Sequence, residues 1–178
     1  MLEHRRDDEA EARLVLPRSC TPDADTVAGT LRDRGWVLEA AALADLEFPE
    51  ALRDAPPEFV AWATSFTRLS SADDAVWFLS AEDYRDPVPE AFAWNAFEQL
   101  SLEAAGSDAH RADIARFWRR HWPVLLAVRG HYAYLAVRDD GVIVHGEEPE
   151  FEETTVIAQD LATLLSAVVE GDGTWGFG

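Results

Sequence analysis

The stretch from residue 124 to residue 145 constrains the fold of this chain of 178 residues more than any other. Three short runs rich in β-forming residues, at 124–128, 131–138 and 142–145, follow one another closely. Arg129-Gly130 separates the first two runs, and Asp140-Gly141 separates the last two. An Asp-Gly pair between hydrophobic runs predicts a tight hairpin in which both central turn residues take positive φ. The stretch therefore predicts a three-stranded antiparallel meander.

The middle run of this meander is apolar on both of its faces. Successive side chains of a strand point to opposite sides of the sheet. One face then carries Tyr132, Tyr134 and Ala136, and the other carries Ala133, Leu135 and Val137. Because both faces are expected to be at least partly buried, helices should cover one of them.

Helix signals lie on both sides of the meander. Thr21-Pro22 is typical of an N-cap followed by proline at the first helical position, and predicts a helix to about Arg34 that stops at Gly35. Asp160 is placed to cap a final helix that ends at Gly171. The apolar side of this final helix is formed by Leu161, Leu164, Leu165 and Val168.

Two further helices are expected in the middle of the chain. After Pro56-Pro57-Glu58, helical spacing places Phe59, Trp62, Ala63 and Phe66 on one face. Residues 108–121 form the second of these helices, with Pro123 as its stop, and residues 92–105 end helically before it.

The remaining signals complete an α+β domain. Residues 76–79 and 154–157 are typical of short strands, and leucines at 43, 46 and 52 suggest helix or turn. We expect a single domain over residues 19–171, with a mainly antiparallel meander sheet packed against several helices. Residues 1–18 are interpreted as a flexible charged leader and residues 172–178 as a Gly-rich tail.

The charge of the chain limits the classes of partner that it is expected to bind. It has 15 arginines, no lysine and 34 acidic residues, for a formal net charge of −19. Such a charge repels phosphate backbones and anionic membranes, so neither nucleic acid nor a membrane is expected as a partner. It favours a basic protein, whose association it accelerates, although the same charge also serves solubility.

The expected localisation of the protein is the cytoplasm. Cys20 is the only cysteine, so no disulfide forms within the chain. The N-terminus has no apolar run of the kind that a signal peptide needs, and no apolar stretch approaches the ~20 residues of a membrane span.

An acidic cluster beside the meander is the predicted partner-binding surface. Five of the seven residues from 147 to 153 are glutamates, with Pro149 and Phe151 among them. The hairpin tip adds two aspartates, which we expect on the same edge of the sheet. The predicted contact residues are Asp139, Asp140, Glu147, Glu148, Glu150, Glu152 and Glu153. A solvated loop without a partner is the alternative interpretation.

Signatures of catalysis are sparse. Gly171, Gly173 and Gly176 spell G-x-G-x-x-G, but they follow a predicted helix, whereas a dinucleotide site lies between a strand and a helix. No two histidines are spaced as a helical metal pair. We expect no catalytic residue, no metal and no cofactor. A small hydrolase using His121, His131 or His145 with carboxylates is a remaining alternative.

The order of these segments resembles the SUKH superfamily, which includes the SMI/KNR type of cell-wall regulators. The resemblance begins at residues 46–52 and 59–62, continues at 76–80, and is best from Trp122-Pro123-Val124 to Val137. Asp140-Gly141-Val142 then matches the second hairpin strand, and residues 160–165 resemble the closing helix. The asparagine-glycine turn of the family is replaced by residues 68–71, so the subfamily stays open.

The resemblance implies an α+β domain without catalytic residues, of which bacterial members are mostly immunity proteins. The leading hypothesis is a non-enzymatic protein that binds and neutralises a cognate toxin, a basic toxin or effector domain. Aromatic residues such as Trp77 or Trp94 are candidates for its contact centre. A regulatory adaptor or scaffold of the same fold is the alternative, and the sequence leaves the oligomeric state open.

Overall fold

The computed structural model describes residues 22–41, 48–85 and 92–171. The expected leader at 1–18, Cys20 and the tail at 172–178 lie outside these residues, as do Leu43 and Leu46. Seven strands form one sheet in which every neighbouring pair is antiparallel and the spatial order equals the chain order. Together with the helices this gives an α+β fold in a single domain, as predicted.

The bounds of the elements follow the chain. The strands are β1 (Val37–Ala40), β2 (Phe66–Ser70), β3 (Val76–Phe78), β4 (His121–Ala127), β5 (Ala133–Arg138), β6 (Ile143–Glu147) and β7 (Thr155–Ala158). The helices are α1 (Ala24–Asp33), α2 (Pro57–Ala63), α3 (Ala96–Ala104), α4 (Asp108–Trp118) and α5 (Leu161–Glu170), with a short 3-10 turn at Glu50–Leu52.

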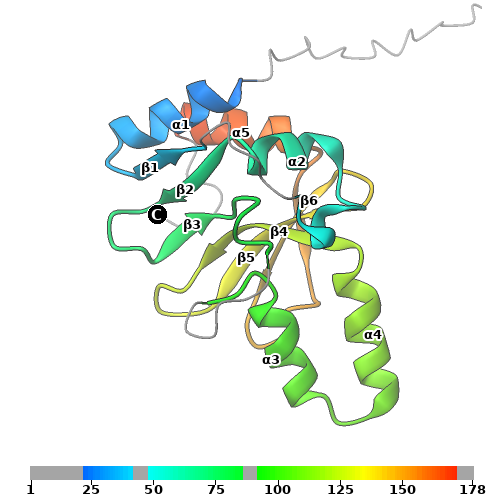
Figure 1. Ribbon diagram of the computed structural model, residues 1–178. Coiled ribbons are helices and arrows are strands. Elements are labelled where there is room, and N and C mark those ends of the chain that lie inside the picture. Colours follow the sequence, from blue (N-terminus) through cyan, green and yellow to red (C-terminus); the bar gives the residue numbers. More distant parts are fainter. Residues whose placement is uncertain (1–21, 42–47, 86–91, 172–178) are drawn as a thin grey trace, which may run out of the picture.

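Helices lie on both sides of the sheet (Figure 1). α1, α2 and α5 lie on one side, where α1 and α5 contact each other. α3 and α4 form a helical hairpin on the other side. This arrangement explains why residues 133–137 of β5 are all buried, although alternate side chains point to opposite faces. The expectation that both faces of the middle strand are buried is therefore confirmed, and helices cover both faces rather than the one expected (Figure 1).

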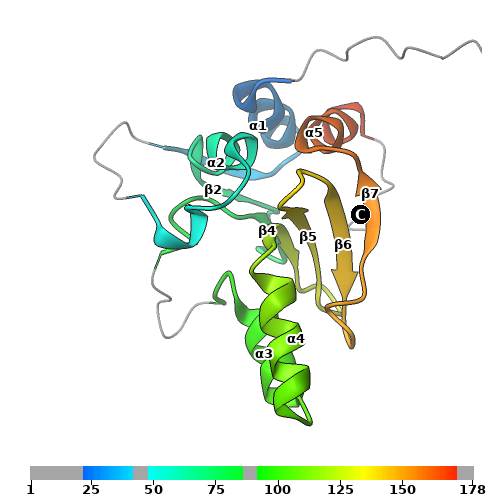
Figure 2. The same cartoon turned by 90° about the vertical axis from the view of Figure 1, so that its right-hand side faces the viewer.

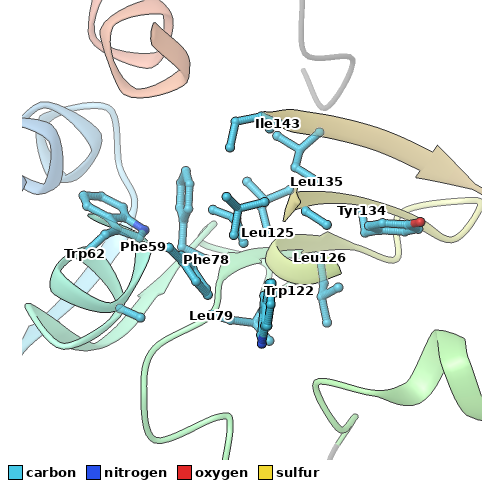
Figure 3. Packing of buried hydrophobic residues seen from close by; sticks show 14 of the residues in the cluster. Phe59, Trp62, Phe78, Leu79, Trp122, Leu125, Leu126, Tyr134, Leu135 and Ile143 are labelled. Atoms are coloured by element: carbon cyan, nitrogen blue, oxygen red, sulfur yellow. The ribbon is translucent and has the colours of Figure 1, made fainter. Parts of the chain in front are cut away.

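The core consists of cross-strand rows of apolar side chains. Leu69, Phe78, Leu125 and Leu135 are paired across β2, β3, β4 and β5, and each is at most 1% exposed. On the side of α2, the ring of Trp62 meets Phe78 edge-on at 5.3 Å. Figure 3 shows this layer, and also Leu126 and Tyr134, which belong to the row on the side of α3 and α4. Burial of these side chains supplies the main driving force for folding.

The predicted meander is confirmed, with one correction to its turn chemistry. β4, β5 and β6 pair as three consecutive antiparallel strands. Gly141 has φ +88°, but Asp140 does not take positive φ, and Gly141 N donates to the carbonyl oxygen of Arg138. The turn thus places its two aspartates at the centre, followed by a left-handed glycine, a common three-residue hairpin loop. Of the two central residues predicted to take positive φ, only Gly141 does so.

Several element boundaries differ from those predicted. Asp23 rather than Thr21 caps α1, because its carboxylate accepts from Thr26 N at 2.7 Å. α2 ends at Ala63, and Phe66 belongs to β2 instead of continuing the helix. α4 ends at Trp118, so Pro123 does not stop it but lies within β4. At the end of the described chain Asp160 caps α5 and Gly171 ends it with φ +76°, as expected.

Among residues 22–41, 48–85 and 92–171, no helix is both long enough and apolar enough to cross a membrane.

Candidate protein-binding surface

The acidic loop, residues 147–153, connects β6 to β7. Glu147 is the last residue of β6, and Glu147, Glu148, Glu150 and Glu153 are exposed, while Glu152 is half-buried. In the described part of the chain, no arginine forms an ion pair with any of these five glutamates. Glu147 has two histidine neighbours: the Nε2 of His131 lies 3.4 Å from a carboxylate oxygen of Glu147, and Glu147 also acts electrostatically on His145. The loop therefore presents uncompensated negative charge to solvent.

Phe151 fastens this loop to the domain. Its side chain is 5% exposed and stacks on Phe97 of α3 with ring centroids 4.6 Å apart. The hydroxyl of Tyr134 donates a hydrogen bond to the carbonyl oxygen of Phe151. A buried aromatic ring and a buried hydrogen bond thus hold the middle of the loop from both its side chain and its backbone.

Two glutamates of the loop also hold its backbone in position. Glu152 accepts a hydrogen bond from the indole nitrogen of Trp118, the last residue of α4, at 2.7 Å. Glu148 accepts from the backbone nitrogen of Tyr132 at 3.0 Å, and its own backbone nitrogen donates to the carbonyl of Tyr132 at 2.9 Å. A loop fixed in this way loses little conformational entropy when a partner binds.

Gly146 makes room for the tyrosine that anchors the loop. Gly146 pairs with Tyr134 across β5 and β6. A Cβ atom at residue 146 would lie 2.5 Å from the Cε1 and Cζ atoms of the Tyr134 ring, closer than any ordinary contact. The absence of a side chain lets the ring lie over the strand and lets its hydroxyl reach Phe151. This glycine is therefore required by the loop anchor.

The two aspartates at the hairpin tip are in a different situation. Asp139 forms a two-point ion pair with Arg120 at 2.7 and 3.1 Å, and Asp140 does the same with Arg138 at 2.9 and 2.6 Å. The Arg120 guanidinium lowers the pKa of Asp139, and the Arg138 guanidinium lowers the pKa of Asp140 to about 2. At the tip, each carboxylate has its own arginine.

The seven predicted contact residues do not form one cluster, which corrects the expectation that they share an edge of the sheet. β6 runs from the tip toward the acidic loop, so the four steps from Ile143 to Glu147 separate the two groups by about 13 Å. Figure 2 shows the tip of the β5–β6 hairpin near α5 and the loop between β6 and β7 at the opposite end of the strands. In a meander, successive turns lie at opposite ends of the strands, so the turn before β6 and the loop after it cannot meet.

The histidines are also divided between the two ends. His121 is buried beside the tip, where its Nδ1 lies 2.8 Å from the carbonyl oxygen of Phe117 and its ring stacks on Phe117 at 3.8 Å. Burial lowers the pKa of His121. At the other end, burial lowers the pKa of His145, which His131 also lowers and Glu147 raises. The described residues contain no group of three or more side chains that could hold a metal ion.

Sequence reasoning missed Glu98, which extends the acidic surface. This residue of α3 is half-buried, and burial raises the pKa of its carboxyl group. The Glu152 carboxylate raises the pKa further, while Arg119 lowers it. No local pattern joins residues 98 and 152, because the packing of α3 against the loop brings them together.

Two hollows occur elsewhere on the described surface. One of about 520 Å³ lies over β2 and β3, where Trp77 meets Phe92 edge-on at 5.9 Å. Arg68 in this hollow bonds Asp74 at 2.6 Å and lies 3.6 Å from Glu39, while Glu82 and Asp83 form no ion pair with any described residue. The other, of about 460 Å³, lies between α2, the start of α5 and the hairpin tip. Trp94 stacks on buried Tyr84 at 5.0 Å and is itself only partly exposed.

Comparison with known proteins adds no relative: no family model, curated protein or solved structure matches this chain.

Proposed function

We propose that this protein is a non-enzymatic binding protein that captures a basic protein partner, and that its biological role is that of an immunity protein which neutralises a cognate toxin. The observation that carries the proposal is the acidic loop. Five glutamates in seven residues have no arginine partner within the described residues, yet the loop is anchored by Phe151 and Trp118. The resemblance to the SUKH superfamily supports the narrower role as an immunity protein.

The acidic loop combines concentrated charge with a backbone that is already held in place. A concentrated negative surface accelerates encounter with a positive partner and repels acidic competitors. Glu150 and Glu153, which make no side-chain hydrogen bond or ion pair to any described residue, are free to meet arginine or lysine of that partner. Because the backbone that carries them is already fixed, binding does not have to order it.

Co-expression with the protein encoded by the neighbouring gene tests the proposal. If that protein arrests growth, this chain should restore growth, and the double variant Glu150→Gln/Glu153→Gln should restore it less well. The matched control is Asp139→Asn/Asp140→Asn, which removes the same number of charges from the tip and should rescue like the natural chain. Absence of any toxicity to rescue would favour the regulatory adaptor.

A second measurement addresses the mechanism of capture. The association rate of the co-purified pair should fall steeply with added salt, because the screening length shrinks from about 30 Å at 0.01 M to about 3 Å at 1 M. A rate that is the same at low and high ionic strength would contradict electrostatic capture.

A further inference from the structure

Within the described residues, β7 is an edge strand of the sheet that carries no charged side chain. It contacts β6 on one side and is the last strand of the sheet. Residues 154–158 contain neither a charged residue nor a proline, and Val156 and Ile157 are 48% and 37% exposed. An edge of this kind presents unpaired backbone N–H and C=O groups, and natural proteins normally blunt it with charges or prolines.

The opposite edge strand, β1, carries a charged residue of the kind that protects an edge against pairing. β1 carries Glu39 near its centre, and this carboxylate lies 3.6 Å from Arg68 of the neighbouring strand. A helix contacts each edge strand, α1 at β1 and α5 at β7, so helix contact does not distinguish the two edges. Both edge pairs contain a register shift, so a bulge does not distinguish them. What distinguishes β7 is its uncharged, β-branched and exposed surface.

Acidic residues lie at both ends of β7. Glu153 is exposed just before the strand, and Asp160 is exposed just after it, where it also caps α5. A second copy of this chain pairing through β7 would bring Glu153 next to Asp160 if antiparallel, and next to another Glu153 if parallel. Either arrangement places like charges together, at a cost in free energy. The complementary occupant is a strand with an uncharged centre and basic ends.

We propose that β7 accepts an extended segment of a basic protein as an eighth strand, with arginine or lysine at the ends of that segment facing Glu153 and Asp160. Backbone hydrogen bonds then provide affinity, as in other cases of strand addition, and the flanking charges select a segment with basic ends. This inference rests on the proposed function for the existence of a basic partner, and it specifies how that partner binds.

Synthetic peptides test the inference on the full chain. The probe has alternating valine and threonine with two arginines at each end. One control replaces the arginines by glutamates, and a second carries N-methyl groups on alternate backbone nitrogens along one edge, which remove donors without removing charge. Amide hydrogen exchange of residues 155–158 should slow at least about tenfold with the probe alone, because paired edge amides exchange only on opening. The exchange rates of the β1 amides should not change when the probe is added.

Two variants at residues of nearly equal exposure distinguish strand addition from nonspecific binding of the probe. Ile157→Lys puts a charge on the edge strand, whereas Leu100→Lys puts the same charge at a residue of α3 that is 38% exposed. Probe affinity should fall about tenfold or more for Ile157→Lys and stay within about twofold for Leu100→Lys. Circular dichroism and urea unfolding of both variants should confirm that they fold.

Three results would overturn the inference. These are equal binding of the N-methylated peptide, protection that is absent from residues 155–158, and a concentration-dependent dimer of the natural chain that Ile157→Lys abolishes. The first two leave electrostatic capture by the acidic loop intact, since growth rescue and its salt dependence are measured separately. Failure of growth rescue, in turn, would contradict the proposed partner, while binding of the probe peptide to β7 is measured independently of it.

Discussion

The two ends of the β5–β6–β7 segment both carry carboxylates, but those at one end are paired with arginines and those at the other are not. At the hairpin tip, Asp139 and Asp140 are each paired with an arginine. At the acidic loop, Glu150 and Glu153 have no such partner in the described chain, although the loop is fastened by Phe151. The contacts made in the fold distinguish the carboxylates that are paired within the domain from those that are available to a partner.

The comparison also shows how a charged loop is kept in place without arginines. The tip is held by its own ion pairs, whereas the acidic loop is held by aromatic packing and hydrogen bonds from Tyr134 and Trp118. Contacts of this kind stabilise the backbone while leaving the carboxylate charge uncompensated. A surface for electrostatic capture needs both properties at once.

The largest expected effect comes from filling the space that the loop anchor needs. Gly146→Val should force the Tyr134 ring away from the strand, because even a Cβ atom lies 2.5 Å from it. Overpacking of this kind costs about 1–3 kcal/mol, and we expect the upper end because Tyr134 is fully buried. Urea unfolding measures the change. Gly29→Ala in α1, where no atom lies within 4 Å of the added Cβ, should be neutral or slightly stabilising.

Next in size is the effect of charge on association. Glu150→Gln/Glu153→Gln should slow association with the co-purified partner by about tenfold at low salt, because it removes charge that steers the encounter. Asp139→Asn/Asp140→Asn removes the same number of charges at the opposite end of β6 and should leave the rate nearly unchanged, since the tip lies away from the acidic loop (Figure 2). Stopped-flow mixing at several salt concentrations measures both. Equal slowing by the two variants would mean that only net charge matters and that the ends do not differ.

A smaller effect is expected from removing one hydroxyl. Tyr134→Phe keeps the ring over Gly146 but leaves the Phe151 carbonyl without its donor, at a cost of about 1–2 kcal/mol. Amide exchange should accelerate at residues 150–153 more than at residues 139–141. If both ends respond equally, the hydroxyl stabilises the sheet as a whole rather than the acidic loop.

The sequence was sufficient to predict the meander because its signals are local. The short runs of β-forming residues and the Asp140-Gly141 turn lie within a few residues of each other, and β4, β5 and β6 pair as they indicate. β2 was missed for an instructive reason. Phe66 continues the helical spacing of Phe59 and Trp62, and it is buried against Trp62 as that spacing requires, but from a strand. The pattern identified the core residue without identifying its element.

The candidate surface was predictable only in part. Glutamates clustered in sequence stay clustered in space, so the acidic loop is visible without a structure. The pairing of Arg120 with Asp139, and of Trp118 with Glu152, joins residues 19 and 34 positions apart. Such contacts depend on how α4 leads into β4 and lies beside the meander. For the same reason sequence alone placed the tip and the loop on one edge, when the strand between them holds them apart.

The smallest expected effect concerns acid stability at the tip. The pKa of Asp139 and that of Asp140 lie below their ordinary values in the folded protein, the latter at about 2. A carboxyl group with a depressed pKa stabilises the folded state above its unfolded pKa of about 3.9 and loses that contribution as the pH falls through the folded value. The ion pairs should therefore add stability that disappears between about pH 4 and pH 2. Urea unfolding of Asp139→Asn/Asp140→Asn should show a small loss at pH 6, limited by solvent screening, and should converge with the natural chain near pH 2. A loss that persists unchanged at pH 2 would mean that the aspartates act through the backbone hydrogen bond from Val142 to Asp140 and the shape of the turn, and not through their arginines.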